Sequence, residues 1–237
     1  MLETLEERRT LGYEFDFSFI WDFWPELAWG AVETVLLSAS SIILGFVAGA
    51  SLAVARVHGS RIVSTIATFY VEAIRNTPLV VQAFWLFFGL AAMGFRLPAF
   101  HAAIITLVIN VSAYTAEIIR AGMESIPKGQ FEAADCLALS RWQVLFHVEL
   151  PQAVERVYPA LISQFVLMML ASSIMSQISV EELTGAAYGI QSITFRGFEI
   201  YIVVAVIYLA LSVLMRFAME LVAQLAFTRR RRLGTPL

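Results

Sequence analysis

The chain has 237 residues, of which 59% are hydrophobic and 15% charged, with a formal net charge of −3 and a mean hydropathy of +0.75. Soluble domains carry more charge, so this composition predicts an all-α integral membrane protein. Its single cysteine, Cys136, excludes an internal disulfide, and its three histidines lack the spacing of metal ligands. We expect no metal site.

The N-terminal segment, residues 1–29, contains no long apolar run, and its first fourteen residues include several charges. This pattern is not that of a cleavable signal peptide, and we expect the segment to be retained. Trp21, Trp24 and Trp29 stand directly before the first apolar run, where an aromatic belt marks the boundary between water and lipid.

Five apolar runs are candidate transmembrane helices. The second is the weakest, because Asn76-Thr77-Pro78 should break a helix at its start. We expect a partly interfacial helix over 61–75 and a spanning helix from Thr77; a single long kinked helix is the alternative. The five candidate spans are 30–55, 78–93, 99–119, 158–178 and 198–227.

The basic residues predict the orientation of these spans. Five spans put the two termini on opposite sides of the membrane. With the C-terminus inside, eleven basic residues fall on inner segments and four on outer ones. The positive-inside rule therefore predicts an extracytoplasmic N-terminus, a cytoplasmic C-terminus and a cytoplasmic loop over 121–153, between the third and fourth spans.

This loop is much longer than a connection requires, which indicates a docking surface outside the bilayer. Residues 125–130 have turn composition, and 131–137 are helix-favouring. Ser140 is a plausible N-cap for a second short helix, which Pro151 should end or kink. The pattern predicts a compact knob of two short helices.

The loop strongly resembles the EAA loop of permease subunits of binding-protein-dependent ABC importers. The matching residues are Glu132, Ala133 and Ala134, followed at the family's spacing by Val148, Leu150 and Pro151. The family usually has glycine where this chain has Ala138. A left-handed alanine there would cost about 1 kcal/mol.

Further motifs resemble the polar amino acid and opine branch of these permeases. They are residues 75–79, 113–122 and 125–134, and the resemblance covers 30–227. It implies five core helices in a bacterial inner membrane and an importer of two permease chains. It also implies a cytoplasmic ABC ATPase dimer and a periplasmic solute-binding protein.

In this family the EAA helix lies in a groove of the ATPase. The resemblance therefore implies coupling roles for residues of the loop. The chain has no Gly-rich phosphate-binding loop and no nucleophile–base pair, so we expect no enzyme activity and no cofactor, with ATP and Mg²⁺ bound by the partner ATPase. The expected coupling residues are Gln130, Glu132, Ala133, Ala134, Ala138, Arg141, Leu150 and Pro151.

Polar residues within spans usually face a bundle interior or a water-filled path. Close packing of small residues between helices is the alternative for the serines. Glu117, near the inner end of its span, has an alternative role in pairing with Arg120 or Arg75. The candidates for a substrate path are Gln82, Asn110, Tyr114, Gln164, Ser172, Ser173 and Ser176.

The resemblance has a second departure. Many family members carry a Lys-Asp pair where this chain has Leu170-Ala171. Either a second, different permease chain supplies these charges or neutral dipoles hold the substrate. We favour the first, which predicts a heterodimer over a homodimer.

Charged residues outside the spans suggest further partners. Glu181 and Glu182 match the family's outward segment and are candidates for contact with the solute-binding protein, with a solvated role as the alternative. The basic tail, 228–237, predicts an anchor on anionic lipid and no nucleic-acid partner. Competing hypotheses are a permease for opines or small peptides, and a non-transporting membrane scaffold.

Overall fold

All regular structure is helical within residues 14–227, the range that this computed structural model describes. The predicted all-α class is confirmed for these residues. A short 3-10 helix, η1 (Ser18–Trp21), precedes the first long helix. Positions 1–13 of the predicted extracytoplasmic segment, and the predicted lipid-anchoring tail 228–237, lie outside the described residues.

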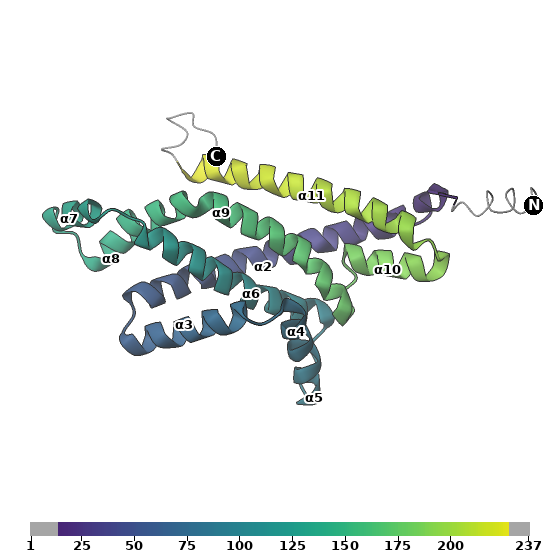
Figure 1. Cartoon of the computed structure of the whole chain (residues 1–237), viewed down its shortest axis with the longest axis horizontal. Helices are drawn as coiled ribbons and strands as arrows, with labels where there is room; N and C mark the ends of the chain where they lie inside the picture. The colour runs from purple at the N-terminus through teal and green to yellow at the C-terminus, as the bar shows by residue number, and fades with distance from the viewer. Residues whose placement is uncertain (1–13, 228–237) are drawn as a thin grey trace, which may run out of the picture.

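Four helical stretches among the described residues are long and apolar enough to cross a membrane. They run side by side along the long axis of the molecule (Figure 1), with α6 packed against both α2 and α9, and α11 against α9. They correspond to four of the five predicted spans. The four stretches are α2 (Trp24–His58), α6 (Ala99–Glu124), Arg141–Ile178, which contains α9 (Leu150–Ala171), and α11 (Gly197–Ala226).

The separate helix expected over 61–75 is observed as α3 (Arg61–Arg75). The predicted second span, 78–93, is a short interrupted segment of α4 (Leu79–Phe84), a π-helical turn η2 (Trp85–Gly89) and α5 (Leu90–Ala92). The segment α4–α5 turns steeply away from α3 (Figure 1). Neither piece alone has the roughly 20 residues that a crossing needs, so five long spans are not observed.

The break lies where the sequence predicts it, and the alternative of one long kinked helix is wrong. Pro78 lacks an amide hydrogen and restricts the residue before it. The carbonyl groups released at the break accept hydrogen bonds from the side chain of Gln82. Its Nε2 lies 2.9 Å from the carbonyl oxygens of both Ile74 and Thr77.

Two glycines on one face of α2 allow α2 and α6 to pack closely. A Cβ atom at Gly45 would lie 2.5 Å from Val111 Cγ1, and one at Gly49 would lie 2.7 Å from the carbonyl oxygen of Ser112. Glycines four residues apart bring membrane helices into backbone contact. This pair of helices forms the centre of the fold.

The helix that begins after Ser140 is longer than the short helix predicted there. Pro151 does not end it: α8 (Arg141–Val144) continues through a π-helical turn η3 (Leu145–Glu149) into α9. Proline is tolerated in the first turn of a helix, and the wider π turn directly before it accommodates the ring. The second short helix is therefore the start of the fourth long stretch.

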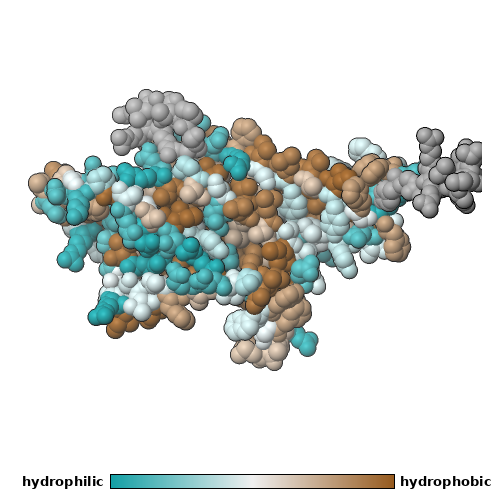
Figure 2. Space-filling view, in the orientation of Figure 1, coloured by the Kyte–Doolittle hydropathy of each residue, from teal (hydrophilic) through white to brown (hydrophobic). Residues whose placement is uncertain are grey.

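This stretch ends in a 3-10 segment, η4 (Ser172–Ile178), and the left-handed residue Ser179. A short helix, α10 (Leu183–Thr194), then leads to α11. Figure 2 shows hydrophilic side chains gathered at the end of the bundle that carries α7 (Lys128–Cys136) and α8. Hydrophobic side chains cover the middle of the same face.

Candidate functional site: a helical loop at the polar end

The predicted loop forms α7 and α8, which lie at one extreme of the molecule (Figure 1). Gln130, Glu132 and Ala133 are exposed on α7, whereas Ala134 is buried and anchors the helix. No hydrogen bond or ion pair joins the Glu132 carboxylate to any residue between 14 and 227. The helix therefore carries an unpaired negative charge on its exposed face. Of the other predicted coupling residues, Ala138, Arg141 and Pro151 are exposed and Leu150 is half-buried.

Ala138 adopts the left-handed conformation that the family's glycine suits. Its φ is 52°. Its amide donates to the carbonyl of Asp135 at 2.9 Å, and the amide of Leu139 donates to the carbonyl of Ala134 at 3.2 Å. These two bonds make the Schellman motif that ends α7. The turn persists with alanine at a cost of about 1 kcal/mol.

Ala138→Gly is therefore expected to stabilise the loop. Relief of the left-handed strain should raise the local opening free energy of the α7 end by about 1 kcal/mol, which slows exchange of the protected amides about fivefold. Hydrogen–deuterium exchange over residues 128–139 measures this. The control is Ala133→Gly, the same change inside α7, which should accelerate exchange. Equal acceleration by both variants would contradict the prediction.

The N-cap predicted at Ser140 is confirmed. Ser140 Oγ accepts from the amide of Gln143 at 3.4 Å, and Gln143 Oε1 accepts from the amide of Ser140 at 2.8 Å. This reciprocal pair is a capping box, which fixes where α8 begins. The turn between α7 and α8 is thus held at both ends.

A small buried cluster joins the loop to the long helices. It brings side chains from the C-terminal ends of α2 and α6 against residues of the loop, so that packing holds the loop to the bundle. The guanidinium of Arg156 adds a bond to the Ser125 hydroxyl at 3.0 Å. The buried members of the cluster are Ala53, Ile119, Met123, Ile126, Leu145 and Ala153.

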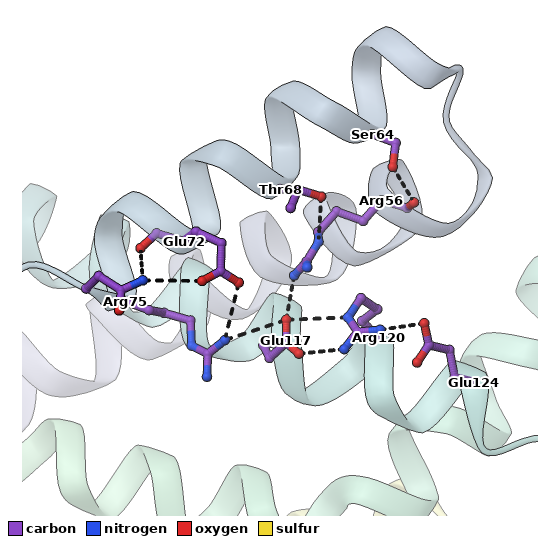
Figure 3. A network of polar contacts seen from close by, with 9 residues as sticks. Arg56, Ser64, Thr68, Glu72, Arg75, Glu117, Arg120 and Glu124 are labelled. Carbon is purple, nitrogen blue, oxygen red and sulfur yellow. Dashed lines mark hydrogen bonds and ion pairs between the residues drawn. The ribbon is translucent and has the colours of Figure 1, made fainter.

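Beside the loop, Glu117 lies at the centre of three arginines from three helices (Figure 3). Its carboxylate is 2.6 Å from both Arg56 Nη1 and Arg120 Nη2, and 3.7 Å from Arg75 Nη1. Glu72 and Glu124 contact the outer sides of Arg75 and Arg120. The predicted pairing of Glu117 is confirmed, and it ties together α2, α3 and α6.

Two predicted substrate-path residues contact each other. Asn110 Nδ2 donates to Gln82 Oε1 at 3.1 Å. Since the Gln82 amide nitrogen already binds the carbonyls at the break before α4, both amides have structural roles in this conformation. Their part in a substrate path stays a prediction.

The other predicted path residues do not line either of two surface hollows in the described part of the chain. The Cζ atom of Arg75 lies over the ring of Tyr114, 5.6 Å from the ring centroid. Gln164 is half-buried. The two hollows, of about 490 and 350 Å³, are lined by other residues. Each of the three serines of η4 donates to the carbonyl three residues before it: Ser172, Ser173 and Ser176.

Glu182 is fully buried and caps α10, whereas Glu181 is exposed. The Glu182 carboxylate accepts from the amide of Gly185 at 2.9 Å and from Tyr208 Oη at 2.7 Å. Burial raises the pKa of the Glu182 carboxyl, and these hydrogen bonds oppose the rise. A buried carboxylate offers no surface to a partner, so Glu182 has a structural role here in place of the predicted contact.

No sequence pattern indicates a structural role for two polar residues at the C-terminal end of α2, Arg56 and His58. Arg56 completes the network around Glu117, and His58 contacts Glu149, 91 residues away in the chain. Both stand near the end of an apolar run, where basic residues are common for reasons of orientation alone. Nothing in their spacing indicates their partners.

Four membrane-length helices that run side by side, with an exposed helical loop at one polar end, define a multi-pass membrane protein. Comparison with known proteins assigns the family. Residues 41–227 match the family described as binding-protein-dependent transport system inner membrane component, and the chain belongs to this family.

Curated relatives agree with this assignment. The glutamine transport system permease protein GlnP of Escherichia coli (strain K12) is 38% identical over 209 residues, which are 87% of this chain and 95% of that protein. The nopaline transport system permease protein NocM of Agrobacterium fabrum is 36% identical over 82% of this chain and 85% of its own.

Solved structures confirm the fold. A crystal structure of an amino acid ABC transporter with histidines superposes with a TM-score of 0.81 at 35% identity, covering 89% of this chain and 99% of the other. The MetNI methionine ABC transporter superposes with a TM-score of 0.73 at 20% identity, covering 90% of this chain and 99% of the other, and supports the fold alone.

Proposed function

We propose that this chain is the permease subunit of an ATP-driven ABC importer that carries polar amino acids across the bacterial inner membrane. The observation that carries the proposal is the exposed α7 helix, with its unpaired Glu132, at the polar end of a bundle with the family fold. A cytoplasmic ABC ATPase dimer docks on this loop. That ATPase binds ATP and Mg²⁺ and performs hydrolysis.

The proposed orientation places the loop in the cytoplasm and the N-terminus outside. The charge asymmetry of the sequence supports it. The fifth crossing is assigned to α3 and the α4–α5 segment together, because the second apolar run of the sequence lies there. The break at Pro78 then lies inside the membrane, where Gln82 satisfies its backbone.

A second, different permease chain completes the translocation path. Leu170-Ala171 carries no charge that could bind a zwitterionic solute. A partner permease with the charged pair supplies what is missing. On the outer side, the exposed Glu181 is the candidate contact for a periplasmic solute-binding protein.

The solute class rests on the names of relatives. Permeases for glutamine, L-cystine, nopaline and octopine are 33 to 39% identical to this chain. Polar amino acids are therefore the first candidates, and opines the second, since an opine carries an amino-acid moiety.

Liposomes containing the chain, its partner permease and its ATPase should import a labelled solute only with ATP inside and loaded binding protein outside. The solutes to compare are glutamine, arginine, cystine and octopine. Uptake of one amino acid supports the proposal, and uptake of octopine alone selects the second candidate. ATP hydrolysis that responds to none of the loaded binding proteins, with no uptake, would refute an importer and favour the scaffold.

A further inference from the structure

A buried carboxylate connects the loop to the first long helix. Glu149 is the last residue of the π-helical turn η3, and its side chain is only 4% exposed. Its Oε2 atom lies 2.8 Å from Nε2 of His58, the last residue of α2. Among residues 14–227, His58 is the only polar partner of this carboxylate.

The π-helical turn directs Glu149 inward. Leu145 and Glu149, its first and last residues, are both buried, while Phe146 and His147 between them are exposed. Leu145 packs in the cluster that contains Ala53 of α2. The same turn therefore makes an apolar and a polar contact near the C-terminal end of α2.

The attachment to α2 differs in kind from the loop's other attachments. The loop is continuous in the chain with α6 at its start and with α9 at its end, so a displacement of the loop reaches both helices through the backbone. It reaches α2 only through non-covalent contacts. The His58–Glu149 pair is the only polar contact between residues 121–153 and α2 in the described chain.

The burial of Glu149 favours keeping the two side chains in contact. A carboxylate with little access to water depends on its partner for hydrogen bonding. Separating the two groups would leave the carboxylate unpaired, so α2 and the loop are favoured to move together.

We infer that His58 and Glu149 form a latch that transmits displacement of the ATPase-docking loop to α2, and that both are positioning residues for coupling. The inference rests on the proposed function. It adds α2 to the elements that an ATPase moves.

The test compares His58→Ala with wild type in liposomes that contain the complete importer. The readout is the number of solute molecules imported per ATP hydrolysed. We expect this ratio to fall about five- to tenfold in His58→Ala, with the ATPase still co-purifying in the wild-type proportion. His58→Gln, which retains an N–H donor, should restore much of the ratio. His147→Ala, an exposed histidine in the same turn, is the matched control and should leave it unchanged.

A double-mutant cycle with Glu149→Gln separates a latch from a merely structural role. The two single variants should lower the ratio, and the double variant should lower it no further. An unchanged ratio in His58→Ala, additive losses in the double variant, or loss of the ATPase from the purified complex would each overturn the latch. Failure of the proposed function gives a different result, because the wild type itself would then show no coupled uptake.

Discussion

Glu132→Lys is expected to release or uncouple the ATPase. The Glu132 carboxylate is exposed on α7 and has no partner among residues 14–227, so a substitution there leaves the fold of the chain intact. In the proposed complex, reversal of the charge places a lysine against an ATPase surface that is complementary to a carboxylate, which costs several kcal/mol. We expect at least about a tenfold loss of ATPase co-purification or of solute-stimulated hydrolysis.

The measurement is pull-down of the ATPase by tagged chain, followed by hydrolysis in liposomes with and without loaded binding protein. The matched control is Glu26→Lys, which makes the same charge change at an exposed position near the N-terminus of α2. This end of the bundle is the one opposite α7 (Figure 1). The control should bind the ATPase as wild type does. Equal binding and equal stimulation for Glu132→Lys would remove the mechanical basis of the proposed function.

Glu117→Gln is expected to have the largest effect on stability. Removal of the central negative charge leaves Arg56, Arg75 and Arg120 facing one another, and Arg56 is only 9% exposed. Loss of one partner from a buried ion pair costs about 3 to 5 kcal/mol. Because Glu117 is 23% exposed, we expect a smaller loss, about 2 to 3 kcal/mol.

Thermal unfolding in detergent measures this as a fall in Tm of about 5 to 10 °C. Glu124→Gln is the control: its side chain is 59% exposed and contacts only Arg120 in the described network, so its effect should be slight. Adding Arg75→Gln to Glu117→Gln should recover part of the loss by removing one repelling charge. An unchanged Tm for Glu117→Gln would show that the network contributes little.

Local chemistry explains which features could be read from the chain. The break before Pro78 and the N-cap at Ser140 depend on residues within a few positions of each other, and both are confirmed. Apolar runs likewise identify the long helices, because the bilayer imposes their length. There are two exceptions. The second apolar run forms the short segment α4–α5 in place of a long helix, and at Pro151 the helix continues through the π-helical turn η3.

The sequence by itself determined the membrane class, four of the five predicted spans and the position of the loop, because these follow from local composition and spacing. Only the tertiary structure decided that Glu117 meets Arg56, that Gln82 binds Asn110, that Glu182 is buried and that His58 contacts Glu149. Each of these contacts joins segments that are distant in the chain. Their partners are selected by the packing of helices in three dimensions, which no local pattern encodes.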